Sequence, residues 1–140
     1  LEELSSDTPS ARAVLEMLPA DAEQAAGETA AAVERLQAVA ADAEVPNIYR
    51  QIASYKAMTL GAEVLSVEER RAGLEALAVP GQPLRLLAEE QLALVEVETG
   101  EREAALTRLQ GMLDDSEITA GLRRRASQLI VALGGDLPES

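Results

Sequence analysis

Alanine and leucine make up most of the apolar residues of this chain, and this constrains its fold more than any other feature. The sequence holds 26 Ala and 21 Leu against 10 Val and 4 Ile, with no Phe and no Trp. Ala and Leu are strong helix formers, whereas the scarce β-branched and aromatic residues favour strands. With so few bulky side chains, the core must consist of close-packed helices with Ala at their contacts. We therefore predict an all-α fold.

The sequence contains neither His nor Cys. It therefore cannot supply a thiolate nucleophile, a disulfide framework, the usual zinc ligands or an imidazole base. It also lacks the glycine-rich phosphate-binding and nucleophile-elbow motifs. We predict that the protein is not an enzyme, has no catalytic residues, and binds no cofactor or metal.

Acidic residues outnumber basic ones by 25 to 12, so the formal net charge is −13. Such a chain repels nucleic-acid phosphates and anionic lipid heads, which predicts no binding to nucleic acid and no membrane contact by this segment. Solubility is the simplest role of the excess charge. No apolar run reaches the ~20 residues that cross a bilayer. Because the chain begins at Leu1 rather than Met, a membrane anchor before it stays open as a hypothesis.

Apolar periodicity predicts about seven helices in a domain that covers residues 9–135. Residues 1–8 are predicted to be frayed or disordered, and 136–140 to form a tail. Pro19 interrupts the first predicted helix, which leaves the arrangement of residues 9–26 open. The later helices are predicted at 28–43, 48–65, 66–77, 84–99, 101–113 and 119–133.

Several residues mark helix ends. Ser66 and Glu69 are spaced for a capping box, in which each side chain accepts a hydrogen bond from the other residue's backbone. Thr119 is a candidate N-terminal cap. Gly100 and the pair Gly134-Gly135 are typical of helix C-termini. The short connections predict antiparallel neighbouring helices.

An internal repeat is the strongest signal. The pattern Gly27-x4-Ala32-x3-Leu36-x2-Val39 recurs as Gly100-x4-Ala105-x3-Leu109-x2-Met112. The offset of 73 residues is about two periods of the 34-residue tetratricopeptide repeat plus a small insertion. We place a degenerate middle copy at Ala72-x3-Ala76-x2-Val79. The pattern predicts antiparallel helix pairs stacked as a tetratricopeptide-like α-solenoid.

Three segments also resemble a known family: AEVPNIYRQIASYKAMTL (43–60), ALAVPGQPLRLLAEEQLALVEVETGEREAALTRLQGML (76–113) and the closing TAGLRRRASQLIVALGG. Together they are similar to the tetratricopeptide-like domain of YfgM-type proteins, over roughly residues 24–135. The resemblance implies a periplasmic domain at the inner membrane, preceded by a membrane-spanning helix, that acts as an ancillary partner of the SecYEG translocon and associates with periplasmic chaperones. Pro19 departs from the family pattern.

In tetratricopeptide stacks the first helix of each pair lines a concave face that binds partner segments. This predicts a protein-binding groove lined by Leu87, Glu90, Leu94, Val97, Arg124, Gln128 and Val131. The alternative is that the stack buries these residues or uses them in self-association. A two-carboxylate peptide clamp is not expected, because only Lys56 and Asn47 could serve it.

Arg123-Arg124-Arg125 is the only basic cluster. The simpler interpretation pairs it with acids of the preceding turn such as Asp114, Asp115 and Glu117. The other is a clamp for a carboxylate or an acidic partner. The adjacent carboxylates Glu68-Glu69, Glu89-Glu90 and Asp114-Asp115 are not expected to perform acid–base chemistry, because helix neighbours point about 100° apart.

The sequence favours a non-enzymatic protein–protein interaction module at the periplasmic face of the bacterial inner membrane. Its partners would be proteins, with the Sec translocon, chaperones and their clients as candidates. The alternative is a structural homo-oligomerisation domain, for example a homodimer, without a client-binding groove.

Overall fold

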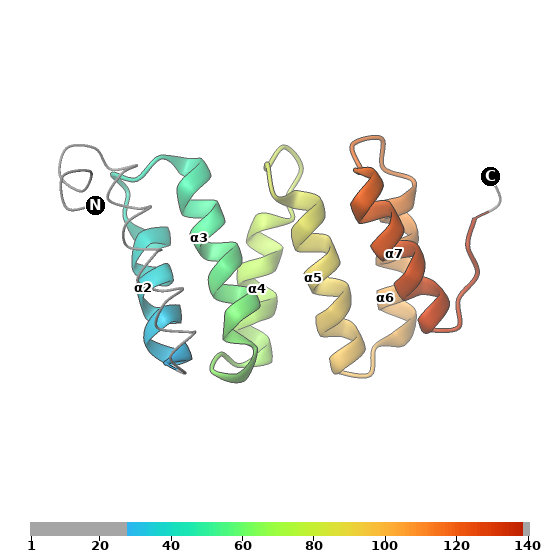
Figure 1. Ribbon diagram of the computed structural model, residues 1–140, viewed down its shortest axis with the longest axis horizontal. Helices are drawn as coiled ribbons and strands as arrows, with labels where there is room; N and C mark the ends of the chain where they lie inside the picture. The colour runs from blue at the N-terminus through green and yellow to red at the C-terminus, as the bar shows by residue number, and fades with distance from the viewer. Residues whose placement is uncertain (1–27, 139–140) are drawn as a thin grey trace. The chain divides into compact units, whose positions relative to one another are not determined.

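The computed structural model describes residues 28–138, and these contain six α-helices and no strand (Figure 1). The all-α prediction is confirmed for this part of the chain. The interrupted first helix predicted within residues 9–26 lies outside the described residues, as do 1–8 and the last two residues of the tail. The helices are α2 (Thr29–Ala41), α3 (Asn47–Leu60), α4 (Val67–Leu77), α5 (Arg85–Glu98), α6 (Arg102–Leu113) and α7 (Ala120–Ala132).

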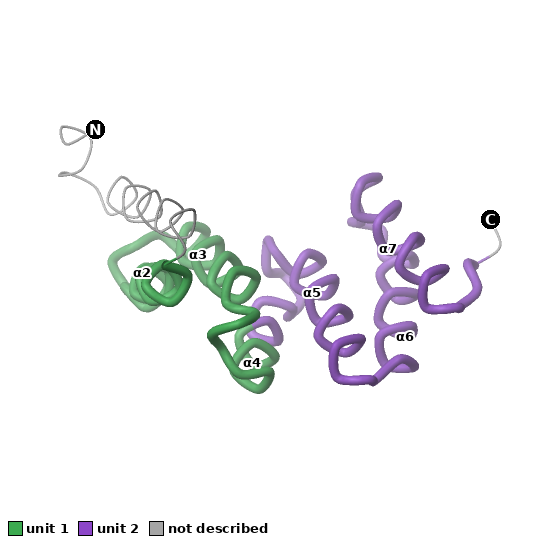
Figure 2. The backbone as a smooth tube through the Cα atoms, turned by 60° about the horizontal axis from the view of Figure 1, so that its bottom comes forward, with its two compact units in different colours: residues 1–73 green, residues 74–140 purple. Residues whose placement is uncertain are grey.

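The chain divides into two compact units, and the boundary between Gly73 and Leu74 falls inside α4 (Figure 2). Among the described residues, unit 1 contains α2, α3 and the first part of α4. Unit 2 contains the rest of α4 together with α5, α6 and α7. Each unit is described below by itself.

In unit 1, α2 and α3 pack through small and branched side chains. The repeat pattern places Ala32, Leu36 and Val39 on one side of α2, and these residues are buried together with Val33. On α3, Ala53 and Ala57 are fully buried. Alanine at these positions lets the two backbones approach closely, as the composition predicts.

Helix α3 ends earlier than predicted. We expected it to continue to about Leu65, but it ends at Leu60, and a 3₁₀ turn follows over Gly61–Glu63. The Leu65 N–H donates to the Gly61 carbonyl at 2.7 Å, and the Leu65 side chain occupies the space a Cβ on Gly61 would need. Ile48, near the start of α3, and Val64, after the 3₁₀ turn, are both exposed.

The capping box at the start of α4 is confirmed. The Glu69 N–H donates to Ser66 Oγ at 3.1 Å, and the Ser66 N–H and hydroxyl both reach Glu69 Oε1. This local bonding fixes the first turn of the helix.

The middle repeat copy was placed in the wrong register. Ala72, Ala76 and Val79 are all exposed, whereas Arg70, Leu74 and Leu77 are buried. The pattern Arg70-x3-Leu74-x2-Leu77 has the same spacing as the other two copies, with an arginine in place of the small alanine. Matching by residue size misplaced it, because burial follows the helix face and not the presence of Ala.

In unit 2, one core cluster joins α5, α6 and α7. Ala93 of α5, Ala105 of α6 and Ala126 of α7 are at most 1% exposed, and Leu109 and Ile130 are fully buried among them. The short turn after α5 reverses the chain direction, so α6 packs back along α5 (Figure 1). These contacts position the site described below.

Gly100 ends α5 in the predicted way. Its φ of +81° is a left-handed conformation that a side chain would disfavour, and it lets the Glu101 N–H bond the Glu96 carbonyl at 2.7 Å. Gly134 ends α7 in the same way, with φ of +79° and a bond from the Gly135 N–H to the Ile130 carbonyl at 2.9 Å.

The internal repeat, whose two copies lie 73 positions apart, extends beyond the four residues of the pattern. When residues 28–61 are aligned with 101–134, 13 of 34 positions are identical, and these pairs include residues outside the buried stripe. Their hydrogen bonds repeat as well: Arg50 donates to the Ala40 carbonyl, and Arg123 donates to the Leu113 carbonyl, both at 3.2 Å. The two segments therefore share a detailed local structure. The identical residues in the first copy are Glu28, Ala31, Ala32, Arg35, Leu36, Gln37, Asp42, Glu44, Arg50, Ala53, Ser54, Leu60 and Gly61.

Candidate functional site

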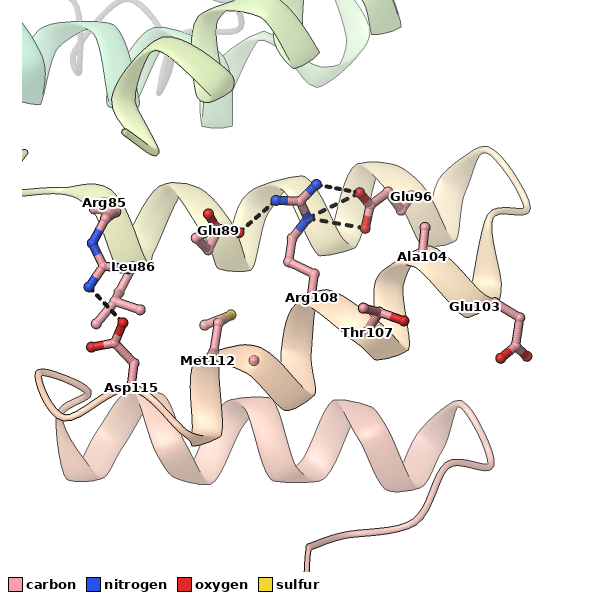
Figure 3. Close-up of a pocket in the computed structure, with 11 residues that line it drawn as sticks. Arg85, Leu86, Glu89, Glu96, Glu103, Ala104, Thr107, Arg108, Met112 and Asp115 are labelled. Atoms are coloured by element: carbon pink, nitrogen blue, oxygen red, sulfur yellow. Dashed lines mark hydrogen bonds and ion pairs between the residues drawn. The ribbon is translucent and has the colours of Figure 1, made fainter. Parts of the chain in front are cut away.

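A groove of about 640 Å³ lies along α5 and α6 (Figure 3). All of its lining residues belong to unit 2. Arg85 and Asp115 stand at one end, Glu103 at the other, and Arg108 lies between them. We call this surface the α5–α6 groove. It is lined by Arg85, Leu86, Glu89, Glu96, Glu103, Ala104, Thr107, Arg108, Gly111, Met112 and Asp115.

Arg108 of α6 binds two carboxylates of α5. Its Nε and Nη2 donate to Glu96 at 2.7 to 3.2 Å, and its Nη1 donates to Glu89 Oε2 at 2.6 Å. The Glu96 side chain is only 3% exposed. The bonds to Glu96, followed by those to Glu89, raise the pKa of the Arg108 guanidinium, although burial acts in the opposite direction. This arginine therefore stays charged and fixes α6 against α5.

Arg85, at the start of α5, makes a similar pair of bonds to the loop between α6 and α7. Its Nη2 donates to Asp115 Oδ2 at 2.8 Å and to Glu117 Oε2 at 3.0 Å. Asp115 also accepts the Glu117 N–H at 2.9 Å. That backbone bond first, and the Arg85 guanidinium second, lower the pKa of the Asp115 carboxyl.

Each of these two arginines is therefore shared between two carboxylates, so each centre carries one excess negative charge. Glu117, the second carboxylate of the Arg85 centre, lies outside the groove lining. The groove lining as a whole holds two arginines and four acidic residues, which gives a formal charge of 2 − 4 = −2. The fourth acid, Glu103, forms an ion pair with the neighbouring Arg102, which lies outside the lining. The groove is thus anionic although its carboxylates are bonded.

One wall of the groove consists of small side chains. Ala104, Thr107 and Gly111 follow one another on the exposed side of α6. No heavy atom lies within 4 Å of a Cβ built on Gly111, so that position is open. Leu86 and Met112 add apolar surface between the charged groups.

Glu89 and Glu90 contact different helices, as expected from their 100° separation on α5. Glu89 binds Arg108 of α6, whereas Glu90 accepts two bonds from Arg125 of α7 at 2.7 and 3.0 Å. Glu90 is also buried. The two neighbouring carboxylates therefore connect α5 to both other helices of the cluster and do not converge on one point.

The residues of the predicted protein-binding groove occupy different environments. Leu94 and Val131 are exposed, as are Arg124 and Gln128, while Leu87 is half-buried. Glu90 is bonded to Arg125, and Val97 packs against the core cluster. Leu87 does line a separate hollow of about 430 Å³, between the loop before α5 and the start of α7. A groove through all seven residues remains a prediction.

Two of the acids expected to pair with the basic cluster bind a different arginine. Asp115 and Glu117 bind Arg85 instead, Arg123 donates to the Leu113 carbonyl, and Arg125 reaches Glu90. The simpler interpretation of the cluster was therefore wrong about these partners. Arg85 lies 30 positions before Asp115 in sequence, yet it reaches Asp115 because α5 packs beside the loop that carries the acids.

Comparisons with known proteins identify no family for this chain. No protein-family model matches it, and neither a curated protein nor a solved structure gives a significant match. Within the described residues, no group of three or more potential ligand side chains could hold a metal ion. No helix among residues 28–138 is long and apolar enough to span a membrane.

Reasoning from the sequence missed the α5–α6 groove and its arginine centres. A signal was present, because Arg108, Asp115 and Glu117 recur 73 positions earlier as Arg35, Asp42 and Glu44. The spacing Arg85-x3-Glu89-x6-Glu96 likewise recurs as Arg12-x3-Glu16-x6-Glu23, which lies outside the described residues. Extending the repeat to charged positions would have identified these residues together.

Proposed function

We propose that the protein is a non-enzymatic protein-binding module, and that the α5–α6 groove is one of its binding surfaces. The observation that carries the proposal is the state of the charged groups there. Glu89, Glu96 and Asp115 are all hydrogen-bonded to arginines that hold helices together. These bonds fix the positions of the carboxylates, and what remains accessible is a groove with small side chains and a charged rim.

Such a surface suits a polypeptide better than a reacting small molecule. Protein interfaces combine a small apolar centre with polar groups at the rim. An acid–base enzyme needs carboxylates whose proton affinities are tuned apart and that converge on a substrate. Glu89 and Glu90 diverge to different helices, which supports the binding role.

Homo-oligomerisation is the second candidate. Leu94 and Val131 are 42% and 59% exposed, so their apolar side chains are accessible to another subunit. In that case the chain would bind a copy of itself through α5 and α7.

The finer hypothesis concerns architecture and location. A tetratricopeptide-like α-solenoid is supported by the repeats that begin at Ala32, Arg70 and Ala105. In each of them, the residues four and seven positions later are also buried. The resemblance of residues 43–60 and 76–113 to YfgM-type proteins supports a place at the periplasmic face of the inner membrane, beside the Sec translocon and its chaperones. Protease accessibility in spheroplasts and in lysed cells tests this location. Digestion only after lysis would contradict it.

Site-specific photo-crosslinking tests the binding role. A crosslinker at Thr107 samples the groove, one at Leu94 samples the exposed side of α5, and one at Glu75 of α4 is the control. We expect discrete crosslinks to another protein from Thr107 but not from Glu75, with unlabelled protein competing for them. Crosslinks only between copies, together with a dimer by light scattering, would replace this proposal with homo-oligomerisation. No crosslinks above the Glu75 control at either position would contradict both.

A further inference from the structure

We propose that the α5–α6 groove binds a cationic helix of a partner protein, whose Lys or Arg side chains contact the excess carboxylates of the two arginine centres. The inference rests on the proposed function and specifies the chemistry of the partner. It combines three observations: the charge of the groove, the way that charge is distributed, and the small side chains beside it.

The charge distribution favours a cation over other ligands. At each centre one guanidinium faces two carboxylates, Glu89 with Glu96 at Arg108, and Asp115 with Glu117 at Arg85. A second cation would neutralise the remaining charge, as in an alternating chain of acids and bases. The Glu89 side chain is 22% exposed and can be reached from the groove, whereas Glu96 is enclosed. Glu89 is therefore the main contact expected at the Arg108 centre.

The small side chains set the shape of the occupant. Ala104, Thr107 and Gly111 extend about 10 Å along α6, from the rise of 1.5 Å per residue. Positions separated by three and four residues form a shallow furrow into which another helix can pack at close range. A helix with cationic residues on one side could place its small residues against this furrow and its charges near Glu89 and Asp115.

Acidic partners are excluded by the same argument. The groove lining has a formal charge of −2, and the whole chain carries −13. An approaching acidic segment is repelled by both, whereas a basic segment is attracted at long range and meets a net negative charge in the groove.

Fluorescence anisotropy with a designed peptide tests the inference on the full chain. The probe is a labelled Ala-rich helix of about 15 residues with Lys at positions separated by four. Its counterpart has Glu at the same positions. We expect the Lys peptide to bind, the Glu peptide not to bind, and the affinity to fall as salt rises from about 50 mM to about 300 mM.

Two substitution pairs separate the groove from the overall charge. Glu89→Gln leaves the Glu96–Arg108 pair in place and should weaken Lys-peptide binding about three- to fivefold, the range of one partly exposed charge contact. The control Glu75→Gln makes the same change in net charge at an exposed position of α4 and should leave binding unchanged. Equal weakening by both would attribute binding to the general field of the chain and overturn the inference.

Gly111→Gln tests the shape. It fills the furrow with a neutral side chain, and it should weaken peptide binding while raising the melting temperature, because glycine is a poor helix former. Ala76→Gln on the exposed side of α4 is the matched control. Unchanged binding by Gly111→Gln would exclude α6 as the docking surface.

Failure of this inference can be distinguished from failure of the proposed function. If the Lys peptide does not bind but Thr107 still crosslinks to a discrete protein, the cationic-helix inference is wrong and the binding role stands. If neither is observed, both are wrong.

Discussion

Two segments of the molecule can be compared directly, because residues 28–61 in unit 1 and 101–134 in unit 2 are copies of one pattern. Their middle parts agree closely. The Glu44 N–H donates to Asp42 Oδ1 at 2.9 Å in the first copy, and the Glu117 N–H donates to Asp115 Oδ1 at 2.9 Å in the second. Both turns therefore form from the same local side-chain bond, which the sequence around them specifies.

Their ends differ. Gly61 and Gly134 occupy the same place in the repeat, yet Gly134 has φ of +79° and Gly61 has φ of −83°. Gly134 is followed by a second glycine and an extended tail, whereas Gly61 leads into a 3₁₀ turn on which Leu65 packs. A glycine at a helix end therefore permits the left-handed conformation but does not impose it. The residues that follow decide.

The greatest loss of stability is expected from substitutions in the cores of the two copies, and comparing these losses tests whether the cores are equivalent. Leu36 and Leu109 are both fully buried at the same repeat position. Replacing either with Ala should reduce the free energy of unfolding by about 3 kcal/mol, through lost burial and the cavity that remains. Chemical denaturation of Leu36→Ala and Leu109→Ala measures both losses. A loss below about 1 kcal/mol in one copy would show that its core repacks and that the copies are not equivalent.

A somewhat smaller loss of stability is expected when the Arg108 centre of unit 2 is disrupted. Arg108→Met should reduce the free energy of unfolding by about 2–3 kcal/mol, because it leaves the enclosed Glu96 carboxylate without its main partner. The double substitution Arg108→Met with Glu96→Met removes the buried charge as well, so it should regain at least half of the loss. A double variant as unstable as the single one would mean that the arginine contributes through packing and not through charge.

A third test compares helix starts in the two units. Ser66→Ala removes the cap of α4 in unit 1, and Thr119→Ala removes the cap of α7 in unit 2, where Thr119 Oγ1 accepts the Leu122 N–H at 3.2 Å. Each should lower the free energy of unfolding by about 1 kcal/mol. Calorimetry on both variants, with the matched Ser116→Ala as a control at an exposed loop position, measures the difference. If only Ser66→Ala destabilises the protein, tertiary packing and not the cap holds the start of α7.

The smallest effect concerns pH. The pKa of Asp115 is lowered in the folded state, below the ordinary value of about 3.9. Its ionised form therefore stabilises the fold above about pH 4, and this contribution is lost as the pH falls through the folded pKa. A carbonyl NMR titration measures that pKa directly.

Arg85→Gln should raise the Asp115 pKa only part of the way, because the Glu117 N–H bond, the largest single cause of the lowered pKa, stays in place. Return of the pKa to its ordinary value in Arg85→Gln would show that the guanidinium alone lowers it and would contradict this expectation. It would also show that the Asp115–Glu117 turn, which has the same hydrogen bond as the Asp42–Glu44 turn, does not by itself lower the pKa of its aspartate.

The helices and most of their ends follow from short-range features of the sequence. Ala/Leu content, apolar periodicity and local capping bonds such as that of Ser66 with Glu69 depend on residues within one or two turns, so they can be read directly from the chain. The all-α fold and the buried stripe from Ala105 to Met112 follow from the same information.

The pairing of charges and the register of the middle copy depend on how the helices pack. Arg85 finds Asp115, and Arg125 finds Glu90, across more than 25 residues, because neighbouring helices bring them together. Local rules instead suggested partners that were adjacent in sequence. Arg70 occupies a position where Ala was expected, since burial depends on which side of α4 faces its neighbours. The α5–α6 groove is made by this packing, and for that reason periodicity alone did not reveal it.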